Sequence, residues 1–162
     1  MGHVHKWPRR NLKELIAFIE EQHGCEPTLE SISKKTGLSA ANISAFFVRD
    51  DMKLSRAEDI VKKYGYELKL FFPLKEYPFG WETHISRKEF PNAGNLTGLV
   101  KYIYDSNITI NHMRKRIGRS YAMITKAFTT GDIFLSNLYL MTNNLNIDVL
   151  WIFEKIETSP SM

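Results

Sequence analysis

An internal repeat limits the fold of this chain more than any other feature. Shifting the sequence by 81 residues aligns it with itself without a gap, from about Leu12–Phe72 onto Ala93–Phe153. The identities fall on residue types that cap helices, form turns or fill cores. They include Thr28 and Thr109, Gly37 and Gly118, Ser39 and Ser120, Ile43 and Ile124, and Phe47 and Phe128. A repeat of this kind predicts two copies of one structural unit.

In the first copy, the residues from Thr28 to Asp51 predict two short helices joined by a tight corner. Thr28 and Ser39 are suited to cap them, because a hydroxyl oxygen accepts from the free amides of a first turn. Gly37 suits the corner, since glycine adopts a left-handed conformation without steric cost. One apolar face of the second helix is formed at helical spacing by Ile43, Phe46 and Phe47.

This segment resembles the helix-turn-helix of the lambda-repressor/Cro-like (XRE-type) DNA-binding family. The matching residues are Ser33, Gly37, Leu38, Ser39 and Ile43, followed by Leu54-Ser55 and by a Gly65–Leu68 "GYEL" stretch typical of some antitoxin-type members. The resemblance implies a DNA-binding helix-turn-helix, and the repeat extends that expectation to the second copy. There Arg114 replaces the small Ser33, so its side chain must point outward or widen the helix crossing.

The flanking pattern predicts a mainly α fold with two tandem helix-turn-helix units. We expect the first unit over residues 10–72, an aromatic and proline-containing linker over 73–92, and the second unit over 93–156. Each unit ends in an apolar stretch. The first, Tyr66–Phe72, reads as a short strand; the second reads as a strand or as a short helix capped by Asp148. Two strands could pair with each other and make the chain a pseudo-dimer.

Helix ends and cores are predicted outside the repeated corner as well. A first helix is expected to bury Leu12, Leu15, Ile16 and Ile19 and to stop near Gly24. Capping boxes are suggested by Asn11 with Glu14 and by Ser55 with Glu58. We expect Asp50, Asp51 and Asp132 to cap loops instead of taking part in catalysis. The linker aromatics Tyr77, Phe79 and Trp81 are expected to pack on the units.

The composition limits the classes of protein to which this chain can belong. The 162 residues carry a net charge of +4, which permits a nucleic-acid partner. The single Cys25 rules out an intrachain disulfide and suits a reducing cytoplasm. There is no apolar run of the length that a membrane span needs and no signal peptide, so we expect a cytoplasmic protein without membrane contact. His3 and His5 have no evident third ligand. No catalytic or phosphate-loop motif occurs, so we expect no metal, no cofactor and no enzyme.

The candidate contact residues lie at the two corners. In the first copy, the base contacts would be Ala40, Ala41, Asn42 and Ser44, and the phosphate contacts Lys34 and Lys35. In the second copy, the base contacts would be Tyr121, Met123, Thr125 and Lys126, and the phosphate contacts Arg114, Lys115, Arg116 and Arg119. The second set is the densest positive cluster in the chain. The arm residues Lys6, Arg9 and Arg10 are further candidates for reaching a groove.

These observations favour a sequence-specific transcriptional regulator that binds double-stranded DNA. The alternative is an antitoxin-like or adaptor module whose helix-turn-helix units bind a protein partner. The weakly charged first recognition helix supports this alternative. The sequence leaves open whether a further homodimer forms and whether the first unit still contacts DNA.

Overall fold

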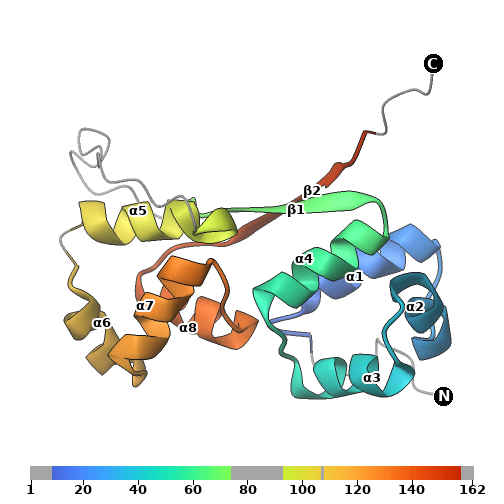
Figure 1. Cartoon of the computed structure of the whole chain (residues 1–162), viewed down its shortest axis with the longest axis horizontal. Helices are drawn as coiled ribbons and strands as arrows, with labels where there is room; N and C mark the ends of the chain where they lie inside the picture. Colours follow the sequence, from blue (N-terminus) through green and yellow to red (C-terminus); the bar gives the residue numbers. More distant parts are fainter. Residues whose placement is uncertain (1–8, 74–92, 107, 158–162) are drawn as a thin grey trace. The chain divides into compact units, whose positions relative to one another are not determined.

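Eight α-helices and one two-stranded antiparallel sheet make up the described part of this chain. A computed structural model describes residues 9–73, 93–106 and 108–157 (Figure 1). The first half contains α1 (Lys13–His23), α2 (Leu29–Thr36), α3 (Ala40–Arg49), α4 (Leu54–Lys63) and β1 (Tyr66–Phe71). The second contains the short 3₁₀ helix η3 (Gly94–Leu96), α5 (Thr97–Asp105), α6 (Ile110–Ile117), α7 (Tyr121–Thr130), α8 (Leu135–Asn144) and β2 (Leu150–Lys155). The predicted linker, with Tyr77, Phe79 and Trp81, lies outside the described residues.

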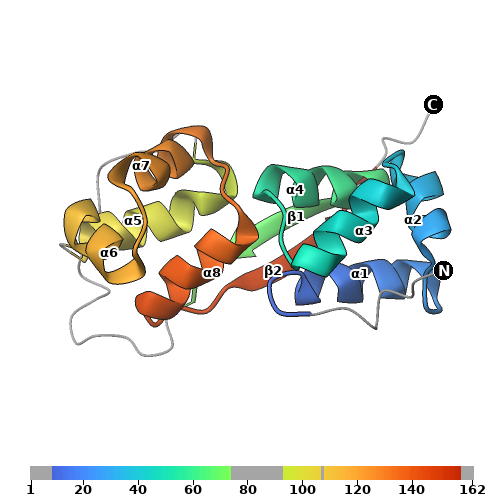
Figure 2. The ribbon, with the colours of Figure 1, turned by 90° about the horizontal axis from the view of Figure 1, so that it is seen from below.

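By their contacts, these residues form two compact units. Unit 1 contains the described residues up to Leu68, together with Phe134–Ser136 and the described residues from Phe153 onward. Unit 2 contains the described residues in Lys69–Ile133 and Asn137–Ile152. Each unit therefore draws on both halves of the sequence. Figure 2 gives a second view of the same elements.

The helix pairs α2–α3 and α6–α7 begin and end at the residues that the sequence indicated. The Thr28 hydroxyl accepts from the amide of Ser31, whose own side chain completes a capping box, and Ser39 caps α3. Ser120 likewise caps α7. Gly37 and Gly118 both adopt left-handed conformations, with φ values of 78° and 69°. Local hydrogen bonding and glycine geometry are thus sufficient to fix both corners.

Two predicted capping boxes are wrong. Helix α1 has Leu12 at its N-cap, and α4 has Lys53 there; neither N-cap makes a side-chain capping bond. Ser55 consequently lies inside the first turn of α4. The Asn11 side chain donates to the backbone oxygen of Asp50 at 3.0 Å instead of capping its own helix.

The N-terminus of α1 is capped by Asp50, a residue about 40 positions away in sequence. Its carboxylate accepts from the backbone amides of Arg10, Asn11 and Leu12 at 3.0–3.2 Å. A second carboxylate of unit 1, on Asp51, accepts from the amide and hydroxyl of Ser136 at 2.9 and 2.6 Å. The Asp132 carboxylate accepts from the next amide, that of Ile133. All three carboxylates accept backbone amides, as expected for loop capping, and those of Asp50 and Asp51 do so at the start of a helix.

The core residues predicted from helical spacing are buried, except that Phe46 of α3 is half-buried. Ile43 and Phe47 are 2% and 1% exposed, and Ile124 and Phe128 are 0% and 5% exposed. The apolar stripe of α1 is fully buried and consists of Leu12, Leu15, Ile16 and Ile19. Gly24 ends α1 in a left-handed conformation, as expected.

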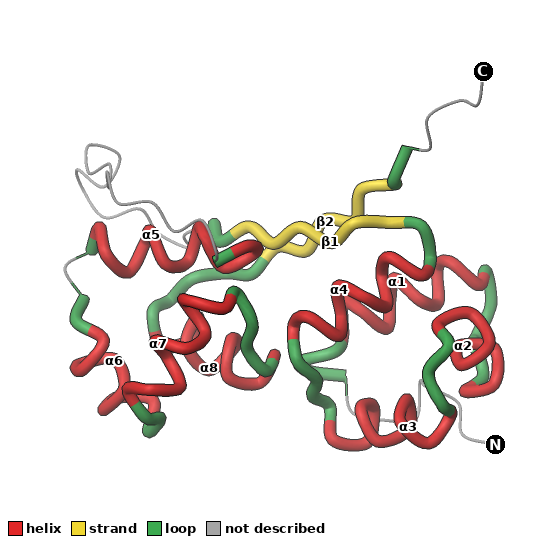
Figure 3. Tube along the Cα trace, viewed as in Figure 1, coloured by secondary structure: helices red, strands yellow, loops and turns green. Residues whose placement is uncertain are grey.

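Both apolar tails are strands, and they pair with each other (Figure 3). The alternative of a short helix after Asp148 is therefore wrong for the second tail. In unit 1, the ring of Phe153 on β2 stacks on Phe18 of α1 with centroids 4.3 Å apart. In unit 2, the indole of Trp151 donates to the hydroxyl of Tyr139 at 2.8 Å. The C-terminal strand thus supplies core side chains to each unit.

Across the described residues, every helix is too short or too polar to traverse a lipid bilayer.

Candidate nucleic-acid interface

The ionised side chains of the second corner, residues 110–130, are all positively charged. It contains five lysine or arginine residues and no carboxylate. Met113, Ile117, Ile124 and Phe128 point into unit 2 and hold α6 and α7 together. Because those apolar residues take the inner face, the cationic side chains are left on the outside.

Two of the four predicted phosphate-contact side chains in this corner are held in place. Arg114 is half-buried, and its Nε donates to Oδ1 of Asn111 at 2.8 Å on the exposed surface. Of the two alternatives expected for this residue, an outward side chain or a wider helix crossing, the outward side chain is observed. Arg119 Nε donates to Oδ1 of Asn137 at 2.9 Å, and its Nη1 donates to the Gly118 oxygen at 3.3 Å.

The other two cations, Lys115 and Arg116, extend from the last turn of α6. Both are exposed, and their side chains have no hydrogen-bond or ion-pair partner among the described residues. Unpaired cations keep their full charge available for an anionic partner. They precede Ser120, the N-cap of α7, by five and four residues, and that capped N-terminus itself favours negative charge.

The predicted base-contact residues of α7 differ in how far they are exposed. Tyr121, at the first position of the helix, is 52% exposed, and Lys126 is also exposed. Met123 and Thr125 are half-buried. The Thr125 hydroxyl donates to the backbone oxygens of Tyr121 and Ala122 at 3.1 and 3.2 Å, so only its acceptor lone pairs remain for an outside partner. Tyr121 and Lys126 are the most accessible polar groups.

The first corner, residues 29–49, is as long as the second but less charged, with three lysine or arginine residues and one carboxylate. Of its predicted base contacts, Ala41 and Asn42 are exposed, whereas Ala40 and Ser44 are half-buried. Its predicted phosphate contacts, Lys34 and Lys35, are both exposed. The ammonium group of Lys35 lies 6.0 Å from the ring centroid of Tyr64, at the outer limit for a cation–π contact.

The first corner has a side-chain hydrogen bond across its turn that Arg114 does not make in the second. The Ser33 hydroxyl donates to the Leu38 backbone oxygen at 2.6 Å, across the turn. The arginine at the equivalent position, Arg114, makes no such bond to the turn and bonds to Asn111 instead. The small side chain at the first crossing therefore has a hydrogen-bonding role as well as a steric one.

Two residues near these corners are not among the contacts predicted from the sequence. Asn137, in the first turn of α8, holds Arg119, and the two residues are 18 positions apart. Arg49, at the end of α3, places its guanidinium 5.8 Å from the Phe46 ring centroid and donates to the Ala45 oxygen. Helical spacing could have placed Arg49 on an outer face, but Asn137 could be found only from the fold.

The basic arm is only partly described. Arg9 forms a bidentate ion pair with Glu20 of α1, with nitrogen–oxygen distances of 2.8 and 3.2 Å. That pairing engages the guanidinium predicted to reach a groove, whereas the side chain of Arg10 is exposed. Lys6, His3 and His5 lie outside the described residues.

No group of three His, Cys, Asp or Glu side chains suited to a metal ion occurs within the described ranges. Two titratable groups of unit 1 are shifted. Burial and then the charge of Lys35 lower the pKa of His23 below its usual 6.5, and burial raises the pKa of Tyr64 to about 12. The two side chains are hydrogen-bonded at 2.8 Å, which indicates a structural role.

This chain matches no protein-family model, no curated protein and no solved structure.

Proposed function

We propose that this protein is a cytoplasmic, sequence-specific DNA-binding regulator with two helix-turn-helix units in one chain. The observation that carries the proposal is the second corner. There a serine-capped helix, α7, follows a left-handed glycine and a run of exposed cations with no carboxylate among them. A capped helix of this kind fits the major groove, and the flanking cations suit the phosphates on either side.

In this proposal the second corner provides most of the affinity. Lys115, Arg116 and Arg119 contact phosphates, and Tyr121 and Lys126 reach base edges. The first corner contributes Lys34 and Lys35 as phosphate contacts and Asn42 as a candidate adenine contact. The difference in charge between the two corners supports this ranking. The proposed role is regulatory and requires no catalysis.

A salt titration tests both the proposal and the ranking. Replacing Lys115, Arg116 and Arg119 together by alanine removes up to three phosphate neutralisations. The slope of log K against log salt should then flatten by up to about 3, at roughly 0.9 for each contact. Fluorescence anisotropy with labelled duplex DNA provides the measurement. The Lys34→Ala/Lys35→Ala double variant should flatten the slope less, and an equal or larger effect from that pair would refute the ranking.

A second candidate function is a protein-interaction module of the antitoxin or adaptor kind. It is supported by the outer surface of α3, where Ala41 and Ala45 are exposed and Val48 is 56% exposed. An apolar helix face suits a protein groove better than a phosphate backbone. Under this alternative, the purified protein binds no duplex DNA at any salt concentration. It instead recovers one stoichiometric protein partner, whose affinity changes little with salt and is lost in Val48→Asp.

A further inference from the structure

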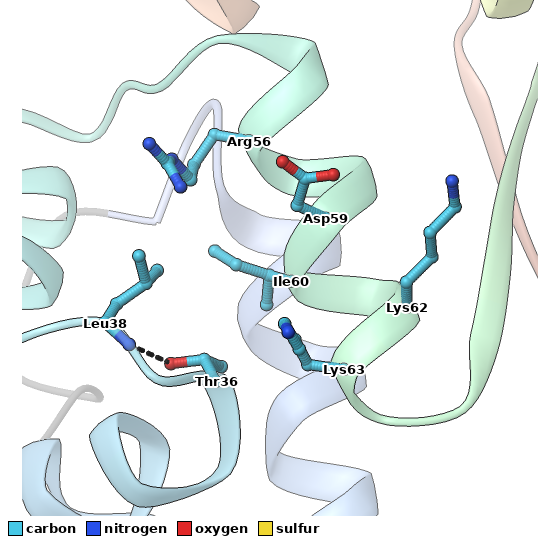
Figure 4. Close-up of a pocket in the computed structure, with 7 residues that line it drawn as sticks. All are labelled: Thr36, Leu38, Arg56, Asp59, Ile60, Lys62 and Lys63. Carbon is cyan, nitrogen blue, oxygen red and sulfur yellow. Dashed lines mark hydrogen bonds between the residues drawn. The ribbon is translucent and has the colours of Figure 1, made fainter.

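A pocket with unpaired charges lies in unit 1, between the turn that ends α2 and one side of α4. Its volume is about 490 Å³. Figure 4 shows Leu38 on the turn and Ile60 on α4 pointing into the space between these two elements. Arg56, Asp59 and Lys63 line the same space. The four α4 residues share one helix face because they are spaced by three, four and seven positions.

Three of the charged side chains that line this pocket have no partner in the part of the chain that the structure describes. Arg56, Asp59 and Lys63 are exposed. Within the described residues, none of the three makes a hydrogen bond or an ion pair through its side chain. Arg56 and Asp59 therefore line one pocket without pairing. Lys62 also lines the pocket, but in Figure 4 its ammonium extends away from Leu38 and Thr36.

The polar group on the turn side is already satisfied. The Thr36 hydroxyl donates to the Ile32 oxygen at 2.8 Å and accepts from the Leu38 amide at 3.3 Å (Figure 4). The remaining free hydrogen-bond donors that face the pocket are the guanidinium of Arg56 and the ammonium of Lys63. Both prefer oxyanion acceptors, with which they form the strongest class of hydrogen bond.

We propose that this pocket binds a small organic oxyanion, meaning a phosphoryl or carboxylate group carried on an apolar body. Arg56 and Lys63 bind the oxyanion, and Leu38 and Ile60 contact the apolar body. The volume lies in the range of small-molecule sites. Asp59 repels the anion and limits its affinity. The proposal does not depend on DNA binding, because no predicted DNA-contact residue lines the pocket.

An NMR titration of the full ¹⁵N-labelled chain tests this proposal residue by residue. Phenyl phosphate, benzoate, inorganic phosphate and benzyl alcohol are added in turn at constant ionic strength. Phenyl phosphate or benzoate should shift the amide signals of Leu38 and Ile60 saturably and bind more tightly than inorganic phosphate. Whichever of the two binds better identifies the preferred oxyanion. Benzyl alcohol, which has the ring without the charge, should give no saturable shift.

Three variants assign the effect to the pocket. The double variant Arg56→Gln/Lys63→Gln should weaken binding by about tenfold or more, because it removes both charge-assisted bonds. Asp59→Asn should bind more tightly than the natural protein. Lys13→Gln, an exposed lysine on α1 that does not line the pocket, is the matched control and should bind like the natural protein.

The spectra also show whether each variant is folded, so a loss of binding cannot be mistaken for unfolding. The proposal is overturned if both organic anions leave the Leu38 and Ile60 signals in place. It is equally overturned if Lys13→Gln weakens binding as much as the pocket variant does, since that result means diffuse attraction to a basic surface.

Discussion

Asp50 is the residue on which the start of the first helix depends. It adopts a left-handed backbone, with φ at 54°, and it is 6% exposed while its carboxylate accepts three backbone amides. Gly131 occupies the equivalent position in the second copy and is also left-handed, with φ at 71°. The two copies therefore share a backbone geometry, but only the first adds a carboxylate that caps another helix.

Removing this carboxylate should lower the free energy of unfolding by an amount that depends on the residue that replaces Asp50. Asp50→Asn tolerates the left-handed backbone but offers one acceptor oxygen in place of two, so we expect a loss of about 1 kcal/mol. Asp50→Gly also fits the backbone but leaves all three amides without this acceptor, so we expect about 2–3 kcal/mol. Urea denaturation measures both losses. Asp59→Asn, an exposed aspartate, should change stability by less than about 0.5 kcal/mol. An Asp50→Gly variant as stable as the natural protein would contradict the capping role.

The His23–Tyr64 pair should make the protein less stable at both acidic and alkaline pH. Because the pKa of His23 is lowered on folding, the unfolded chain takes up a proton first as pH falls through 6.5, and stability falls there. Because the pKa of Tyr64 is raised from 10.0 to about 12, stability should also fall as pH rises between those values. Denaturation midpoints measured from pH 8 to pH 5 should drop less in His23→Gln than in the natural protein. Identical profiles for both proteins would remove His23 from this account.

At the scale of elements, α8 acts as a support for the second corner. Its first turn places Asn137 against the guanidinium of Arg119, whose one other hydrogen bond within the described part of the chain goes to the Gly118 oxygen beside it. The corner of unit 2 is therefore built from three helices: α6, α7 and the turn between them carry the cations, and α8 orients Arg119 of that turn. The first corner differs, since Lys34 and Lys35 have no equivalent hydrogen-bonded support among the described residues.

Replacing Asn137 by alanine separates the orientation of Arg119 from its charge. The number of cations is unchanged, so the slope of log K against log salt should stay the same. DNA affinity should fall by about two- to tenfold, the cost of immobilising one long side chain on binding. Anisotropy titrations at several salt concentrations give both quantities. A flatter slope in Asn137→Ala would show that Arg119 no longer contacts phosphate at all.

At the scale of the whole molecule, the two corners present different surfaces to a partner. One offers Ala40, Ala41, Asn42 and Ser44, and the other Tyr121, Met123, Thr125 and Lys126. A symmetric DNA site matches a protein that presents the same recognition surface to both half-sites, which lie about one helical turn apart. If both corners read DNA, as proposed, their two unlike surfaces have no such symmetry to match.

We therefore expect a non-palindromic DNA site that is read more strongly by the second corner than by the first. Selection of bound fragments from a random duplex library should return an asymmetric consensus. Exchanging the four residues of the first surface for those of the second should make the selected site more symmetric. A palindromic consensus for the natural protein would instead indicate a homodimer that uses one unit per chain. No enriched sequence at all would favour the protein-interaction role.

The sequence alone determined the helices, their corners and most of their buried faces. Thr28, Gly37, Ser39 and the repeated apolar positions could be read because their effects act within one or two turns of the chain. The tertiary structure decided which residues that are distant in sequence contact one another. Asp50 rather than Asn11 caps α1, Phe153 stacks on Phe18, Asn137 orients Arg119, and Leu38 closes a pocket against Ile60. Local patterns set conformation, whereas the choice of partner for a carboxylate, a ring or a guanidinium depends on which elements pack together.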